Sequence, residues 1–413
     1  MFIIYFSVFS ALSVAKRMFF AQKEKINQND INYAKRTQFR TKSNFYKPNE
    51  NKELQRKMQI GHLVKTNPNE PNFSCISVRG RYVDQPKGKK TNLRLMLKIG
   101  KINLEVPYFQ AALAGYSDYA MRTIARDCGA PLVFAGAMLA KSVIHPKVFN
   151  SPTFKPGDDE HPIGAQLLGE DAEIMAKAAK VVLKAGYDLI DLNFACPAPK
   201  VIRRKRGGFL LNDPDKVIEI YNAVKGAVDC PVTMKLRTSF NNKSYDNFWD
   251  ICSRAVTGGV DALIVHPRAV CQRFAGEADW QFLTEVKKRF PRTIIFGSGD
   301  LFSADTIKNN IRDSGVDGAA IARGAIGNPW IFSQLRMGDD FVAPTLREQG
   351  QVILKHFSLV CKLYEHKKAI RYFRKFVLAY CRGHPSRKKA QKALFTAKTA
   401  EEFFAAVKQW YEL

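Results

Sequence analysis

The stretch PIGAQLLGEDAEIMAKAAKVVLKAGYDLIDLNFA, residues 162–195, contains one complete strand–helix–strand unit. Two apolar runs, 162–169 and 189–195, flank the segment 171–186, whose apolar residues recur at helical spacing. An acidic first turn and the closing Gly186 are typical of helix ends. Because parallel strands need a crossover connection, this unit predicts two neighbouring parallel strands covered by a helix.

The same unit recurs along the chain, with further helical stretches such as 213–228. The candidate strands are 107–112, 132–137, 162–169, 189–195, 231–238, 262–268, 293–299 and 318–324. Eight such units predict an α/β protein with a (β/α)8 TIM barrel rather than an open, doubly wound sheet.

Three parts of the chain differ in composition. Residues 1–95 are rich in Lys, Asn and Gln without a sustained period, so we expect a disordered segment that is either an over-extended gene start or a genuine basic leader. Residues 96–335 carry the barrel pattern. Residues 344–413 predict an all-α helical domain, with apolar positions at helical spacing at Ile353, Phe357, Val360 and Leu363.

The formal charge of +27 is concentrated at the two ends of the chain. Residues 1–95 carry a net +13 and residues 344–413 a net +10, whereas residues 96–343 carry +4. A solvated surface is one interpretation, but such concentration favours a polyanionic partner such as nucleic acid. The cations expected to face it are Lys367, Lys368, Arg371, Arg374 and Lys375, with Arg203, Arg204, Lys205 and Arg206.

The eight cysteines form no CxxC pair and do not cluster with the seven histidines. This spacing argues against a zinc site, an iron–sulfur cluster or a disulfide framework, and suits a reducing compartment. No apolar run reaches the length of a transmembrane helix. We therefore expect a cytoplasmic monomer, organellar if the leader is genuine, that binds neither membranes nor DNA.

Polar residues gather at the carboxyl ends of the predicted strands, where TIM barrels carry their active sites. Two of these ends, GSGD at 297–300 and ARGAIGNPW at 322–330, are Gly-rich and precede predicted helices. Backbone N–H groups at helix starts, together with Arg323, predict a phosphate-bearing cofactor there. No GxGxxG follows the first strand, so a Rossmann dinucleotide site is not expected.

From about Met96 to Leu413 the chain resembles the tRNA-dihydrouridine synthase family. The resemblance rests on several motifs in order: AALAGYSDYAMR (111–122), NFACPAPKVIRRKRGGFLL (193–211), MKLR (234–237), HPRAVCQRFAGEADW (266–280), the two Gly-rich turns, and IRYFRKFVLAYCRG (370–383). It implies an FMN-dependent enzyme that reduces a uridine of tRNA to 5,6-dihydrouridine with electrons from NADPH or NADH, and a C-terminal RNA-binding domain.

The resemblance also implies roles for individual residues. We expect FMN contacts from Ala112, Ala114, Gln166, Lys235, His266, Ser298, Gly299, Arg323 and Gly324. Substrate contacts are expected from Asn193, Lys200 and Arg237. Hydride would reach C6 of the uracil from reduced FMN, and Cys196 would donate the proton to C5 as a general acid.

That role requires a protonated thiol, and the cations of 200–206 would favour thiolate unless they point toward RNA phosphates. Lys235 and Arg237 alternate along one strand and therefore share a face, which suits an anion in the barrel mouth.

The chain departs from the family pattern at three places. Ala111-Ala112-Leu113 stands where Ala-Pro-Met is usual, Ala135-Gly136-Ala137 where Ser/Thr-Glu-Met is common, and Ser298 where Asn is usual. Other interpretations therefore stay open: the same chemistry on ribosomal RNA, a flavin barrel acting on a free pyrimidine, or a non-catalytic RNA-binding protein.

Overall fold

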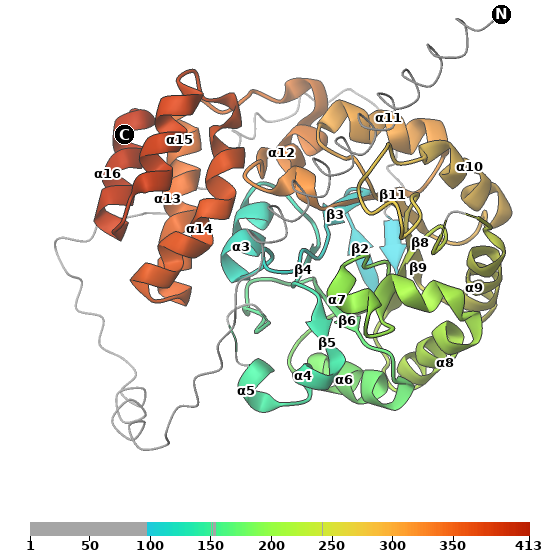
Figure 1. The fold of residues 1–413 in the computed structure, drawn as a ribbon. Coiled ribbons are helices and arrows are strands. Elements are labelled where there is room, and N and C mark those ends of the chain that lie inside the picture. Colours follow the sequence, from blue (N-terminus) through green and yellow to red (C-terminus); the bar gives the residue numbers. More distant parts are fainter. Residues whose placement is uncertain (1–96, 150, 152–153, 242) are drawn as a thin grey trace, which may run out of the picture. The chain divides into compact units, whose positions relative to one another are not determined.

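The computed structural model describes residues 97–413, except 150, 152–153 and 242, so the leader predicted for 1–95 lies outside the described residues. Within this part of the chain, eight parallel strands close into a barrel surrounded by helices (Figure 1), which confirms the predicted fold class. The strands are β3 (Tyr108–Gln110), β4 (Val133–Phe134), β6 (Ile163–Leu168), β7 (Leu189–Phe194), β8 (Val232–Arg237), β9 (Ala262–His266), β10 (Ile295–Gly297) and β11 (Gly318–Ile321).

The barrel closes because β4 pairs with both β3 and β6, and β3 pairs with β11. Among the described residues, a short strand, β5 (Met138–Leu139), pairs with the carboxyl-terminal end of β6 and with no other strand. Each predicted strand range contains one of the observed strands, since the continuous apolar runs are buried on both faces.

Helices with well-defined caps connect the strands. Asp171 and Asp213 accept hydrogen bonds from the backbone at the first turns of α6 (Ala172–Lys184) and α8 (Pro214–Lys225), as expected for N-caps. Both predicted helices are thereby confirmed. The other connections are α3 (Tyr119–Asp127), α4 (Ala140–Val143), α5 (Pro146–Phe149), α7 (Pro199–Ile202), α9 (Asp246–Thr257), α10 (Trp280–Arg289), α11 (Ala304–Ser314) and α12 (Trp330–Met337).

Aromatic side chains fill the inside of the barrel. The Phe109 ring centroid lies 4.9 Å from that of Phe296 and 5.3 Å from that of Phe134. A hairpin of β1 (Leu97–Ile99) and β2 (Ile102–Leu104) adds Ile99 and Leu104 to this cluster. Its turn lies beside the residues that precede β8 and β9, so the hairpin covers the amino-terminal end of the barrel and leaves the carboxyl-terminal end for a site.

Four helices follow the barrel: α13 (Leu346–Leu363), α14 (His366–Tyr380), α15 (Arg387–Thr396) and α16 (Ala400–Trp410). Ile353, Phe357 and Val360 of α13 are fully buried, as their spacing predicts, and the Phe357 ring centroid lies 4.2 Å from that of Phe403. The hydroxyl of Tyr372 on α14 donates to the carbonyl oxygen of Tyr116, in the loop after β3, at 3.2 Å. Among the described residues, no helix has the length and apolar character that crossing a membrane requires.

Candidate active site

A cavity of about 230 Å³ opens at the carboxyl ends of the barrel strands. Of the residues chosen from the sequence, those that line it are Ala112, Ala114, Gln166, Asn193, Cys196, Lys235, Arg237, His266, Ser298, Gly299, Arg323 and Gly324. Lys200 does not line the cavity; it lies on the short helix α7, where its side chain is exposed. Four of the positions that depart from the family pattern, Ala112, Leu113, Ala137 and Ser298, also face this cavity.

A chain of hydrogen bonds runs across the floor of the cavity. Asn193 Oδ1 accepts from the backbone N–H of Cys196 at 3.0 Å, and Asn193 Nδ2 donates to Gln166 Oε1 at 2.7 Å. Gln166 Nε2 donates in turn to Asp191 Oδ2 at 2.7 Å. These partners fix the orientation of both amides. Sequence reasoning missed Asp191, although strand alternation places it on the same face as Asn193.

Asp191 on β7 and Lys235 on β8 are buried groups of opposite charge, and each shifts the pKa of the other. Burial raises the pKa of Asp191 to about 6, although Gln166, Thr233 and Lys235 all act to lower it. Burial lowers the pKa of Lys235 to about 8, helped by Arg237 and opposed by Asp191. Lys235 Nζ has no hydrogen-bond partner among the described residues. A buried amine without an acceptor is costly, so this side of the cavity suits a ligand that carries acceptor atoms.

The imidazole of His266, at the end of β9, is neutral. Burial lowers its pKa to about 2, and the cations Lys235, Arg237, Arg268 and Arg323 lower it further. Arg268 Nη1 lies 3.1 Å from His266 Nε2. Since a guanidinium can only donate, Nε2 accepts and we assign the ring proton to Nδ1.

Asp300 anchors the loop after β10. Arg268 Nη1 donates to Asp300 Oδ1 at 3.1 Å, and Arg323 Nη2 lies 3.4 Å from the same oxygen. Burial acts to raise the pKa of Asp300, but the hydrogen bonds from Arg268 and the Ala278 N–H hold it below its usual range.

The loops after β10 and β11 pack closely against each other at Gly324, beside the cavity. Gly299 has φ +119° and Asp300 has φ +54°, so this turn is not helical, and α11 begins later, at Ala304. The segment after β11 begins with a 3-10 turn, Arg323–Ala325, instead of an α-helix. A helix follows each turn, as predicted, but not directly: α11 begins at Ala304, after the left-handed backbone of 299–300, and α12 begins at Trp330, after the 3-10 turn. A Cβ at Gly324 would lie 1.9 Å from the carbonyl oxygen of Leu301, so only glycine fits.

The Cys196 thiol is partly buried at the cavity wall. Burial raises its pKa above the ordinary value, against the opposing effects of a backbone hydrogen bond from Ala198 and the charge of Arg237. The thiol is therefore protonated at neutral pH. The Gly207-Gly208 pair holds this loop: Gly208 N donates to the Cys196 carbonyl oxygen at 3.1 Å, and Gly207 has φ +57°.

The basic segment beside Cys196 is divided between two roles. Arg203, Arg204 and Lys205 are exposed, whereas Arg206 is only 7% exposed and donates to Glu170 Oε1 at 2.6 Å. The expectation that Arg206 faces RNA is therefore wrong, since Glu170, just after β6, supplies the partner that a buried guanidinium needs.

The cations of α14 divide in the same way. Lys367, Lys368 and Arg371 are exposed. Arg374 Nη2 donates to the Ala397 carbonyl oxygen at 3.1 Å, and Lys375 Nζ lies 3.1 Å from the Tyr372 ring centroid. Arg374 and Lys375 are thus half-buried and bound within the protein, contrary to the prediction for them.

The cavity has further lining residues that sequence reasoning did not choose as site residues: Leu113, Ala137, Ala195, Pro197, Phe274, Asp300, Leu301, Phe302 and Ala322. Phe274 and Phe302 are exposed by 54% and 44%. Their signal in the sequence is weak, since it consists of single aromatic residues in the loops after two strands.

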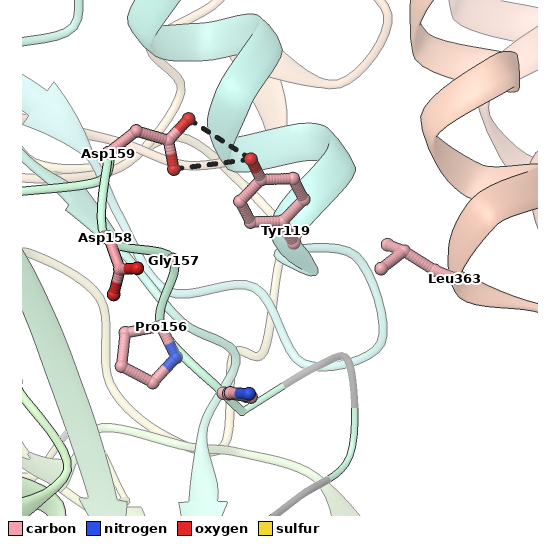
Figure 2. A pocket seen from close by; sticks show the side chains of 7 residues that line it. Tyr119, Pro156, Gly157, Asp158, Asp159 and Leu363 are labelled. Atoms are coloured by element: carbon pink, nitrogen blue, oxygen red, sulfur yellow. Dashed lines mark hydrogen bonds between the residues drawn. The ribbon is translucent and has the colours of Figure 1, made fainter. Parts of the chain in front are cut away.

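A second cavity, of about 500 Å³, lies outside the barrel mouth and is shown in Figure 2. Its lining includes residues 155–159, Tyr119 and Leu363. The Tyr119 hydroxyl points at Asp159 and donates to its two carboxylate oxygens at 3.3 and 3.1 Å. We place the candidate active site in the smaller cavity, because the polar strand ends and the shifted pKa values converge there.

Comparison with known proteins matches residues 109–411 to the family model "Dihydrouridine synthase (Dus)". The chain is 33% identical over 297 residues to "tRNA-dihydrouridine synthase B" of Pseudomonas putida, covering 71% of this chain and 87% of that protein. It is 35% identical over 295 residues to the protein of the same name from Pasteurella multocida, covering 70% and 87%. A "Probable tRNA-dihydrouridine synthase" of Rickettsia conorii is 31% identical over 299 residues, covering 70% and 89%.

Proposed function

Since the chain belongs to the dihydrouridine synthase family, we propose that it is an FMN-dependent enzyme that reduces a uridine of tRNA to 5,6-dihydrouridine with NAD(P)H. The observation that carries this proposal is one cavity with a protonated Cys196 thiol and an unpartnered Lys235 ammonium in its lining. Reduction of a uracil ring requires a proton donor, which the thiol provides. It also requires a positive charge that stabilises the negative charge on the cofactor, which the ammonium provides.

The lining residues fit FMN on three counts. Lys235 Nζ is buried and lacks an acceptor, which a flavin ring would supply. Gly299 and Gly324 line the cavity with backbone alone, and Arg323 adds a cation beside them for a phosphate. When bound, FMN supplies the hydride that goes to C6 of the uracil.

Asn193 holds the uracil in this proposal. Its Oδ1 accepts from the N–H groups of Ala195 and Cys196 at 3.1 and 3.0 Å, and one Nδ2 hydrogen goes to Gln166. The second Nδ2 hydrogen remains for a carbonyl oxygen of the substrate. Because the amide is held on both sides, it cannot rotate away from that orientation.

Cys196 supplies the proton. Hydride addition at C6 breaks the C5–C6 double bond and leaves the electron pair on C5, and that pair takes the proton from Cys196 Sγ. The resulting thiolate lies in the field of Arg237, which favours the anion, and water returns its proton. Overall, uridine, NAD(P)H and one proton give dihydrouridine and NAD(P)+.

We further propose that residues 344–413 form an RNA-binding domain. Lys367, Lys368 and Arg371 on α14 are exposed cations, as are Arg203, Arg204 and Lys205 beside Cys196. Phosphate contacts from these side chains would hold a folded RNA while one base leaves its stack and enters the barrel. The names of the relatives favour tRNA over ribosomal RNA as that substrate.

The test uses the full-length protein, purified and examined for flavin absorbance. It is then mixed with NADPH or NADH and with separated tRNA and ribosomal RNA from cells that lack dihydrouridine, and the product is quantified by mass spectrometry. We expect a yellow protein that forms dihydrouridine in tRNA. A yellow protein that oxidises NADPH but reduces only free uracil compounds would contradict the RNA substrate, and a colourless RNA-binding protein would contradict the enzyme.

A further inference from the structure

Two exposed phenylalanine rings lie at the mouth of the cavity, on different loops. Phe274 belongs to the connection between β9 and α10, and Phe302 to the connection between β10 and α11. They are exposed by 54% and 44%. The guanidinium of Arg323 lies 4.2 Å from the ring centroid of Phe274 and 5.3 Å from that of Phe302. Two exposed aromatic rings that contact one guanidinium at the rim of a cavity form a candidate binding surface.

The Phe274 loop is braced on both sides of the ring. Gln272 Oε1 accepts from the Ala269 N–H at 2.6 Å, before the ring. After it, the Gly276 carbonyl oxygen accepts from Arg268 Nη2 at 2.6 Å. Arg268 is itself 2% exposed and paired with Asp300. The ring is thus held at the rim by buried polar contacts, which lowers the entropy cost of binding a ligand there.

The chemistry of the rim suits a nucleotide. The ring of Phe274 offers a flat apolar surface, and the guanidiniums of Arg237 and Arg323 lie 5.6 and 4.2 Å from its centroid. Nucleic-acid-binding proteins combine aromatic rings, on which bases stack, with cations that contact the phosphates.

The depth of the residues indicates which nucleotide binds there. Asn193 is 8% exposed and Arg237 is 2% exposed, so the target uridine must enter the cavity to reach them and Cys196. The neighbouring nucleotide is joined to it by one phosphate and stays at the rim, where Phe274 lies. Resting on the function proposed above, we propose that Phe274 stacks the base of the RNA nucleotide adjacent to the target uridine.

The test measures RNA binding separately from turnover. Phe274→Ala removes the ring, Phe274→Trp keeps an aromatic surface, and Met337→Ala removes an apolar side chain that is 40% exposed at the far end of α12. The dissociation constant for a fluorescent, unmodified tRNA transcript is measured by anisotropy on the oxidised protein. Flavin content and the rate of flavin reduction by NADPH without RNA are measured in parallel.

Phe274→Ala is expected to raise the dissociation constant, and KM for RNA, about 5- to 100-fold, because a stacked base is lost. Phe274→Trp should restore binding to within about threefold, and Met337→Ala should bind as the wild type does. Met337→Ala should leave flavin content and reduction by NADPH unchanged, and the Phe274 variants are compared with the wild type on flavin-loaded protein, because Phe274 contacts Arg323.

Two results would overturn the inference. One is an unchanged dissociation constant for Phe274→Ala in a preparation whose wild type binds the transcript. The other is a loss confined to flavin reduction by NADPH, which would assign the ring to the dinucleotide donor instead. A wild type that binds the transcript yet forms no dihydrouridine would contradict the proposed function and leave the binding comparison valid.

Discussion

Asn193 Nδ2 donates a hydrogen bond of 2.7 Å to Gln166 Oε1, which links the ends of two neighbouring strands, β6 and β7. Gln166 Nε2 in turn donates to Asp191 Oδ2 at 2.7 Å, which holds the Gln166 amide with its oxygen toward Asn193. The orientation of the amide beside Cys196 thus depends on the charge state and position of a carboxylate deeper in the barrel. Substitutions along this line should therefore affect stability and turnover together.

Gln166→Glu should make the stability of the protein depend on pH. The new carboxylate would lie beside Asp191, whose pKa is already raised to about 6. The folded variant must then retain a proton that the unfolded chain releases near pH 4, so the variant loses stability as pH rises from about 5 to 8. Thermal unfolding of the flavin-free protein at pH 5.5 and pH 8 measures the effect.

Gln166→Met serves as the control, because it removes both hydrogen bonds and adds no titrating group. It should cost about 1–3 kcal/mol, and somewhat more at pH 8 than at pH 5.5, because the lost hydrogen bond acts to lower the pKa of Asp191; this pH dependence should be weaker than that of Gln166→Glu. Parallel pH profiles for Gln166→Glu and Gln166→Met would contradict the coupling between positions 166 and 191.

Cys196→Ala should retain flavin and tRNA binding but form dihydrouridine about 10²- to 10⁴-fold more slowly, because the proton donor is missing. Single-turnover mass spectrometry of the product measures this loss. In the wild type, burial raises the thiol pKa above its ordinary value, so turnover should not fall through loss of this proton between pH 7 and 8. Unchanged turnover in Cys196→Ala would remove the thiol from the mechanism.

Lys235→Met should stabilise the flavin-free protein while weakening flavin binding. Burial destabilises the charged form of Lys235, and no hydrogen bond within the described residues offsets this. Methionine has a similar shape without the charge. We expect a gain of about 1–3 kcal/mol near pH 5.5, where Asp191 is largely protonated, and a smaller gain above about pH 6, where ionised Asp191 loses the opposite charge of Lys235. Urea unfolding and flavin titration measure the two effects.

Lys235→Arg keeps the charge and should give no such gain. A Lys235→Met protein that is less stable than wild type at pH 7 would show that Asp191 compensates the ammonium fully without a ligand.

His356 should limit stability in acid. The ring is fully buried against Phe373 and Phe376, and Nδ1 lies 2.8 Å from the Tyr380 hydroxyl. Burial, with a smaller effect of Lys375, lowers its pKa to about 3, whereas the unfolded chain takes up the proton near pH 6.5. Between pH 6.5 and 4.5 the unfolded state alone is protonated, which costs the fold about 2–3 kcal/mol.

His356→Phe removes the titrating group and is the direct comparison. Its deficit in unfolding free energy relative to wild type, measured in urea, should shrink by that amount from pH 7 to 4.5. A deficit that stays constant would show that the imidazole does not titrate between the two states.

The barrel could be predicted because its strands are continuous apolar runs and its helices carry their own caps. In such a fold the strand ends converge, so residues as distant as Gln166 and Arg323 fall in one cavity by topology alone. Local alternation also placed Lys235 and Arg237 correctly.

The residues that sequence reasoning misjudged depend on partners from distant parts of the chain. In the sequence, Arg206 is one cation among several. Only its ion pair with Glu170 in the structure shows that it supports the Cys196 loop. Lys375 likewise contacts Tyr372 and the loop after β3. Phe274 gives only a weak signal, because a single aromatic residue in a loop does not show that its ring is exposed beside Arg323. Charge type predicts a basic face, but burial decides which cations are available to it.

Arg203→Ala and Arg206→Ala remove one positive charge each from the same segment, so their comparison separates RNA binding from folding. Arg203 is exposed, and its loss should leave stability within about 0.5 kcal/mol while lowering the slope of log Kd for tRNA against log salt by about 1. Arg206→Ala leaves Glu170 without its buried partner and should cost about 1–3 kcal/mol. Thermal unfolding and anisotropy titrations at several salt concentrations measure both. If Arg206→Ala changed only the salt slope, the side chain would be free for RNA and its contact with Glu170 would not support the Cys196 loop.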